Sequence, residues 1–144
     1  MASVEEALDA VADLTESFGE LIESGTRRLG LTPVRARVVF ALHEGGPARQ
    51  RTLGRALGMS PQQLAVICEA LVGKGLVRRD PDPDDRRALR LSLTDDGEDA
   101  AAEIARLRRE VGEALLGDLD GESRSTLQAL CTTMIARAGR VSGR

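Results

Sequence analysis

The stretch that decides the fold runs from Leu53 to Leu93 and reads LGRALGMSPQQLAVICEALVGKGLVRRDPDPDDRRALRLSL. A short helical segment should end at Gly58, where the chain turns. A second helix is predicted to begin at Ser60-Pro61, because Ser60 can cap it, Pro61 suits the first helical position, and Gln63 can complete a capping box by reaching back to the Ser60 amide. The sequence therefore predicts a helix, a tight turn and a second helix in immediate succession.

The second helix is predicted to pack one face on a core and to expose the other. Its apolar positions recur every three or four residues, as an amphipathic helix requires. The expected inward positions are Leu64, Ile67, Cys68 and Leu71. The expected outward positions are Gln62, Ala65, Val66, Glu69, Ala70 and Gly73.

A charged hairpin is predicted to follow this helix. Residues 76–80 and 88–93 are expected to be strands, and the polar turn PDPDDRR lies between them. The two prolines of that turn cannot donate ladder hydrogen bonds, so the hairpin should project as a stiff finger with Arg86 and Arg87 near its tip. The expected inward positions of the second strand are Leu89, Leu91 and Leu93.

The rest of the chain is predicted to be helical. Residues 4–29 carry apolar side chains at every third or fourth position, as does the region after Thr94 and again after Gly121. A further helix should begin at Thr32-Pro33, and an extended piece should surround Ala48. A helix as long as the first exceeds what one small core can cover, so a second subunit could cover the remainder.

Composition favours a single domain made of packed helices. The chain has 144 residues and 42% hydrophobic content, but only 1% aromatic content with no Trp or Tyr. The lack of aromatic side chains argues against a protein that stacks single-stranded nucleic acid. Two cysteines and a first segment without a signal-peptide pattern lead us to expect a cytoplasmic protein with reduced thiols.

Charge is segregated along the chain although the net charge is only -3. Residues 1–26 carry a formal charge of -7, residues 27–90 carry +7, and residues 91–144 carry -3. A cationic central region between anionic helices could dock on a polyanion through one face. Solvated charged faces would give the same pattern, so charge alone leaves both interpretations open.

The segment GLVRRDPDPDDRRALRLSLTDDG, residues 75–97, resembles the wing signature of the MarR (multiple antibiotic resistance regulator) family. Leu31-Thr32 and residues 57–61 also fall where that family has them, so the resemblance covers nearly the whole chain. It implies a mainly α fold with a small β-hairpin wing. Residues 1–30 would be an N-terminal dimerisation helix, residues 31–94 a winged helix-turn-helix DNA-binding region, and residues 95–144 C-terminal dimerisation helices.

The resemblance also implies partners and residue roles. The protein would bind an inverted repeat in double-stranded DNA as a homodimer. Arg86 would enter the minor groove, and Asp85 and Arg87 would brace the wing by ion pairing. The residues expected to contact backbone and bases are Ser60, Gln62 and Gln63. Because glutamine can bond adenine through two hydrogen bonds, either glutamine is a candidate for direct readout.

The second helix departs from the family pattern. Members usually have a Thr-Arg pair and a further Arg at positions that hold Ala65, Val66 and Ala70 here, and no Lys or Arg lies between Ser60 and Gly73. Readout should therefore depend on thymine-methyl contact, for example from Val66, and on glutamine. Phosphate contacts are expected from Arg49, Arg51 and Arg55. We expect an A·T-biased or weakly discriminating site, with an affinity that depends unusually strongly on salt.

The remaining reactive residues do not form a recognisable catalytic or metal site. His43 is the one histidine, and a helix-stabilising role is favoured over that of a ligand or base. Cys68 and Cys131 are expected to act as small hydrophobic residues. Asp82, Asp84 and Asp85 do not fit a calcium loop. We therefore expect neither an enzyme nor a metal or cofactor requirement.

Two functions from different classes follow. The first is a ligand-responsive transcriptional regulator, usually a repressor, released from DNA by a small anionic or phenolic effector; the ligand rests on the resemblance alone. The second is a winged-helix protein-interaction module that has lost sequence-specific readout and binds a protein through Val66 and its neighbours.

Overall fold

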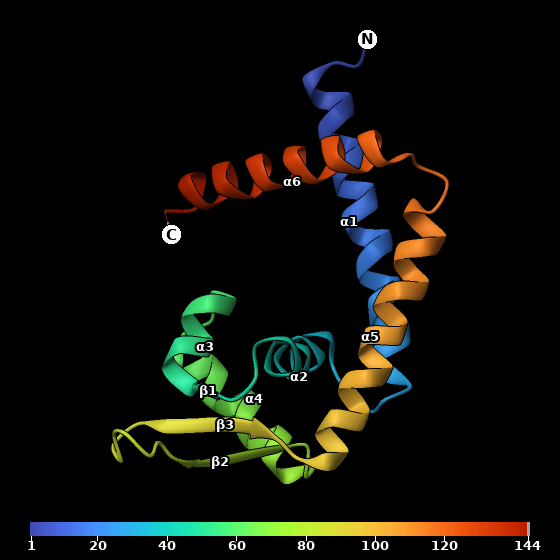
Figure 1. Cartoon of the computed structure of the whole chain (residues 1–144). Coiled ribbons are helices and arrows are strands. Elements are labelled where there is room, and N and C mark those ends of the chain that lie inside the picture. Colours follow the sequence, from blue (N-terminus) through green and yellow to red (C-terminus); the bar gives the residue numbers. More distant parts are fainter. Residues whose placement is uncertain (144) are drawn as a thin grey trace. The chain divides into compact units, whose positions relative to one another are not determined.

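The computed structural model describes residues 1–143 (Figure 1). Within that range the elements are α1 (Val4–Arg27), α2 (Pro33–Gly45), β1 (Ala48–Arg49), α3 (Gln50–Leu57), α4 (Pro61–Gly73), β2 (Val77–Pro81), β3 (Leu89–Leu93), α5 (Asp95–Leu116) and α6 (Gly121–Val141). Met1–Leu107 form one compact unit, and a second begins at Arg108, inside α5. The prediction of a mainly helical chain with a small β element is confirmed.

The β element is a three-stranded antiparallel sheet in the order β1-β3-β2. The extended piece predicted around Ala48 is β1, and it pairs with the middle of β3 through Ala48 and Leu91. The hairpin register runs from Val77 opposite Leu93 to Pro81 opposite Leu89. The sheet thus ties the start of α3 to the hairpin, which Figure 1 shows extending beyond the neighbouring helices.

One predicted inward strand position is wrong. Leu91 is fully buried, whereas Leu89 is 42% exposed. Leu89 lies opposite Pro81 at the distal end of the hairpin, beyond the reach of the helical core. Side chains alternate along β3 as predicted, but the core ends before the strand does.

The core of the first unit forms where α2, α4 and β3 meet. The inward face predicted for α4 is confirmed, since all four positions are buried: Leu64, Ile67, Cys68 and Leu71. From α2, Val38, Val39 and Leu42 join the same cluster. Burial of these side chains fixes which face of α4 remains toward solvent.

The turn between α3 and α4 is set by a glycine and a serine. Gly58 adopts a left-handed conformation with φ of 64°, and its N–H donates to the carbonyls of Arg55 and Gly54. Ser60 caps α4 by accepting from the Gln63 N–H at 3.1 Å. The predicted return bond from the Gln63 side chain is not among the hydrogen bonds of the described residues, so only half of that capping box forms.

The junction between β3 and α5 depends on Thr94 and Gly97. The Thr94 hydroxyl accepts from the Gly97 N–H at 3.0 Å and donates to the Gly75 carbonyl at 2.6 Å. Gly97 is buried, and a Cβ on it would overlap the carbonyl oxygen of Leu76. Only glycine therefore lets α5 begin this close to the start of β2.

Two long helices leave apolar side chains exposed. On α1 one described residue, Thr26, is buried, while Val4, Leu8, Leu14 and Phe18 are 45–80% exposed. On α6 no described residue is buried, and Leu130 and Ile135 are 57% and 72% exposed. Residues 1–143 contain no helix whose length and hydropathy would suit a membrane span.

Replacing Gly97 tests the α5 junction. The variant Gly97→Ala should lower the free energy of unfolding by about 1–3 kcal/mol, because backbone must shift to accommodate the methyl group. Urea unfolding at one fixed protein concentration measures the change. Gly45→Ala is the control, since Gly45 ends α2 with no atom within 4 Å of the added Cβ. An equal loss of unfolding free energy in both variants would contradict the close approach of Gly97 to the Leu76 carbonyl.

Candidate nucleic-acid interface

The solvent face of α4 carries the residues predicted to read bases. Gln62, Gln63 and Val66 are exposed, and Val66 retains 67% of its accessible surface. Ser60 stands at the N-cap, where its side chain is used by the helix. This face offers two amide side chains and one branched apolar side chain, but no cation.

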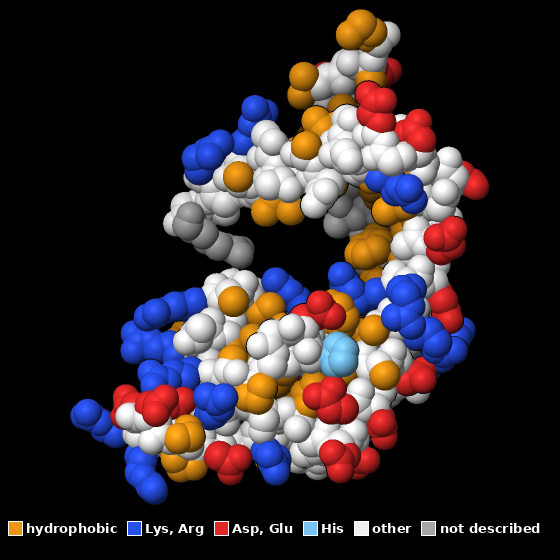
Figure 2. Space-filling view, in the orientation of Figure 1, with side chains coloured by type: hydrophobic (Ala, Val, Ile, Leu, Met, Phe, Trp, Pro, Cys, Tyr) orange, Lys and Arg blue, Asp and Glu red, His pale blue; other side chains and the backbone are white. Residues whose placement is uncertain are grey.

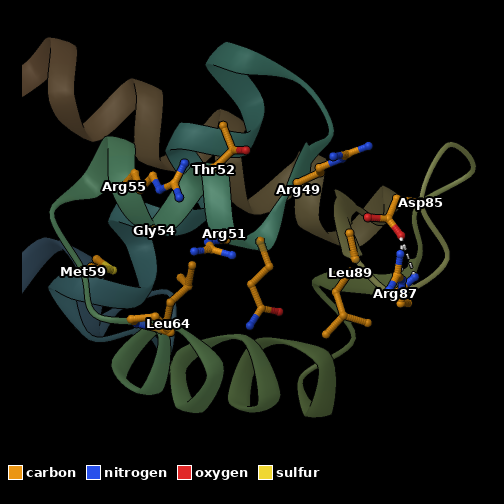
Figure 3. Close-up of a pocket in the computed structure, with 13 residues that line it drawn as sticks. Arg49, Arg51, Thr52, Gly54, Arg55, Met59, Leu64, Asp85, Arg87 and Leu89 are labelled. Carbon is orange, nitrogen blue, oxygen red and sulfur yellow. Dashed lines mark hydrogen bonds and ion pairs between the residues drawn. The ribbon is translucent and has the colours of Figure 1, made fainter.

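Cations come from α3 instead. Arg51 and Arg55 are exposed on α3, which packs beside α4. Both line a groove of about 990 Å³ that reaches from α3 and the start of α4 to the hairpin (Figure 3). Arg49 and Arg87 line the same groove. Figure 2 shows blue side chains gathered over α3 and the hairpin, and in these elements they are all arginines.

The tip of the hairpin is a closed loop. The Asp82 N–H donates to the Ala88 carbonyl at 2.8 Å, and the Ala88 N–H donates to the Asp85 carbonyl at 2.9 Å. Arg86 lies in this loop and is exposed. The loop thus presents the Arg86 side chain outward from a short, hydrogen-bonded turn.

Asp85 and Arg87, the residues expected to brace the hairpin, interact only locally. Arg87 Nε lies 3.8 Å from Asp85 Oδ1, and the same oxygen accepts from the Arg87 N–H at 3.1 Å. The Arg87 side chain is 96% exposed. An ion pair this exposed contributes little to stability, because water screens it.

The hairpin contains a buried carboxylate that sequence reasoning missed. The side chain of Asp82 is 2% exposed, and Arg49 donates to it through Nε at 3.1 Å and Nη2 at 3.2 Å. The N–H groups of Asp84 and Asp85 donate to Asp82 Oδ1 at 2.9 and 3.2 Å. Arg90 Nη1 is 3.8 Å from Oδ2.

These contacts shift the ionisation of the pair. The hydrogen bonds from Arg49 and from the Asp84 N–H hold the pKa of Asp82 below its ordinary value. The same carboxylate raises the pKa of Arg49. Both groups are therefore charged at any pH near neutrality. The sequence predicts only a phosphate contact for Arg49, because nothing local links it to an aspartate 33 positions later.

Outside this face, His43 has a structural partner and Cys68 is buried. His43 Nδ1 lies 2.9 Å from Glu98 Oε2, which connects the end of α2 to the start of α5. Cys68 is fully buried, and burial raises the pKa of its thiol while Arg79 opposes the shift. Cys131 is half-buried. Within residues 1–143, no three His, Cys, Asp or Glu side chains are placed to hold a metal ion.

A sequence model of the MarR family matches residues 29–88, which include the helix-turn-helix and most of the hairpin. The crystal structure of a probable transcriptional regulator from Pseudomonas aeruginosa is 30% identical, covers 87% of this chain and 93% of its own, and superposes with a TM-score of 0.73. The chain belongs to the MarR family. The predicted winged helix-turn-helix fold is confirmed with it.

Other similar proteins carry regulator names. The HTH-type transcriptional repressor NicR of Pseudomonas putida is 28% identical over an alignment of 134 positions, which covers 85% of this chain and 85% of NicR. A mutant E. coli MarR in complex with operator DNA has the same fold with a TM-score of 0.78 at 19% identity, covering 92% of this chain and 99% of that one. The names of these relatives describe regulators rather than enzymes.

The burial of Cys68 leads to a prediction about thiol reactivity. In a Cys131→Ser variant, Cys68 should react with a maleimide at least about tenfold more slowly in the folded protein than in urea, because both exposure and thiolate content are low. Mass spectrometry of labelled protein follows the rate. Equally fast labelling of the folded and unfolded protein would contradict the packing of α4.

Proposed function

We propose that this MarR-family chain is a DNA-binding transcriptional regulator. The observation that carries the proposal is that one groove of the same compact unit is lined from α3, the start of α4 and the hairpin, and Arg51, Arg55 and Arg87 are among its lining residues. The exposed residues of α4 and the exposed Arg86 belong to elements that border this groove. A helix face beside a basic groove and a projecting arginine suits major-groove entry with flanking backbone contact.

Roles for single residues follow from their placement. Gln62 and Gln63 are placed to bond base edges, with adenine as the preferred partner, and Val66 to contact a thymine methyl. Ser60 at the N-cap of α4 and Arg51 on α3 would contact phosphate. Arg86 would insert into the minor groove. An Arg-free α4 surface favours an A·T-biased site over guanine readout.

The exposed apolar faces of α1 and α6 support a homodimer. Neither face is covered within its own compact unit, and apolar patches of this extent mark interaction sites. Residues 1–30 and 95–144 would then be the dimerisation helices and residues 31–94 the DNA-binding region. A symmetric dimer would bind an inverted repeat whose half-sites lie about 34 Å apart, one helical turn of DNA.

We infer further that the regulator is a ligand-responsive repressor. Its resemblance to a repressor of P. putida supports the direction of control. A small anionic or phenolic effector would act by favouring dimers whose two α4 helices no longer match the groove spacing. A shift between two pre-existing spacings is sufficient to release DNA.

Exposure of Val66 favours one alternative. An apolar side chain 67% exposed on a helix face without cations would also suit a protein partner. In that case the winged helix would be a protein-interaction module that no longer reads DNA.

Selection of genomic fragments by the purified protein, followed by titration of the enriched duplex, tests the function. We expect enriched fragments to share an A·T-biased inverted repeat. Arg86→Ala should weaken binding by roughly 5- to 150-fold, the loss of about 1–3 kcal/mol typical of a specific groove contact. Arg124→Ala removes the same charge from α6 and should leave affinity nearly unchanged.

The interaction-module alternative would be supported by a wild-type protein that shows no duplex binding at low salt. Equal weakening by both arginine variants would mean that Arg86 supplies only net charge.

Sedimentation and substitutions on α1 test the proposed dimer. Sedimentation should give a species of twice the 15.4 kDa chain mass. Leu14→Glu should raise the dissociation constant at least about 100-fold, because the interface would bury an unpaired charge. Asp13→Lys, on the acidic side of the same helix, should leave the dimer intact. Equal weakening by both variants would place the interface elsewhere.

A further inference from the structure

We infer that Arg49 and Asp82 form a positioning pair that holds the tip of the hairpin, and with it Arg86, in the orientation needed for DNA contact. The inference rests on the proposed function, because it assigns the pair a role in the same interface. Neither residue need touch a base for this role. They would affect DNA binding by fixing the conformation of the loop that carries Arg86.

The first support is the bridge between two distant segments. Arg49 ends β1, directly before α3 begins at Gln50, whereas Asp82 follows β2 in the hairpin. The guanidinium meets both carboxylate oxygens, at 3.1 and 3.2 Å. This two-bonded geometry fixes orientation as well as distance. The hairpin is therefore anchored beside the entry to the helix-turn-helix.

The second support is the fold of the loop itself. Asp82 Oδ1 accepts the N–H groups of Asp84 and Asp85, and the Asp82 N–H closes the loop on Ala88. Arg86 lies between these bonded positions. The chain from 82 to 88 is thus folded around one carboxylate, and removing its charge would release both the turn and the link to β1.

The third support is burial. The Asp82 side chain is 2% exposed, and a carboxylate withdrawn from water must be fully hydrogen-bonded to remain charged. By contrast, Asp85 and Arg87 face solvent at 46% and 96% exposure and join neighbouring positions of the same loop. The buried pair is the stronger brace because it connects the loop to another strand.

The pair also reassigns Arg49. Its Nε and Nη2 donors are committed to Asp82, although 43% of the side chain is exposed. Its main contribution is then positional, and the phosphate contacts of this side fall to Arg51 and Arg55. The effect of a charge change at Asp82 on DNA binding can separate a positional role of Arg49 from a phosphate-binding role.

Neutralising an acid near DNA ordinarily strengthens binding, because repulsion from phosphate falls. If Asp82 acts through its pair with Arg49, neutralising Asp82 should weaken DNA binding instead. Asp82→Asn should weaken binding of the selected duplex at least about fivefold, the effect of losing charge-assisted hydrogen bonds. The matched control is Asp84→Asn, which makes the same charge change at an exposed position of the same loop and should leave affinity equal or slightly higher. Equal or tighter binding by Asp82→Asn would overturn the inference.

A double-mutant cycle tests the partnership. Arg49→Ala should weaken binding, and adding Asp82→Asn to it should cost little more, because the link is already lost. Arg51→Ala combined with Asp82→Asn should instead show additive losses. Additive losses in both cycles would show that Arg49 acts through phosphate and not through Asp82.

Hydrogen exchange of the DNA-free protein tests the conformation of the loop without any contribution from duplex binding. In Asp82→Asn, the amides of Asp84, Asp85 and Ala88 should exchange faster, while the amides of α4 keep their protection. Unchanged loop exchange would overturn the pair as a brace. If the wild-type protein bound no duplex, the proposed function would fail, and with it the DNA role of the pair, while loop exchange would still show whether the brace exists.

Discussion

The Asp82 carboxylate imposes the strictest local constraint on the interface, because it is an ionised group almost without water. Its charge is tolerated only while a guanidinium and two backbone N–H groups donate to it. Satisfying that requirement fixes the loop that presents Arg86 and joins the loop to β1. The need to hydrogen-bond one buried charge thus determines the conformation of residues 82–88, which would otherwise form an exposed turn.

The rest of the unit supplies the platform for this loop. Packing of α2, α4 and β3 sets which face of α4 meets solvent, and the left-handed Gly58 sets the turn before it. Close approach at Gly97 brings the start of α5 against the hairpin base. Rigid packing of these elements would hold the α4 face, the α3 cations and the wing in one relative arrangement.

Sequence predicted the features that depend on neighbours along the chain. The cap at Ser60, the helix start at Thr32-Pro33, the buried face of α4 and the two hairpin strands were predicted because periodicity and capping are local signals. Leu89 was misplaced because alternation does not tell where the core ends. The return bond of Gln63 did not form among the described hydrogen bonds, which leaves its amide exposed on the proposed reading face.

The pairing of Arg49 with Asp82 lay beyond local reasoning. Two residues 33 positions apart meet only because β1 joins the edge of β3, and a two-residue strand leaves almost no pattern. The resemblance to the MarR family directed attention to Asp85 and Arg87 in the shared motif. In the structure, the same motif also contains Asp82, and the partner in its better buried ion pair, Arg49, lies outside the motif.

A crystal structure of the protein on its selected duplex would show whether the Arg49–Asp82 pair positions Arg86 for DNA contact. Arg86 is expected in the minor groove, with the Arg49 guanidinium still bonded to both oxygens of Asp82 and the Gln62–Gln63 end of α4 in the major groove. A complex in which Arg49 leaves Asp82 to bind phosphate, or in which the loop lies away from the DNA, would contradict it.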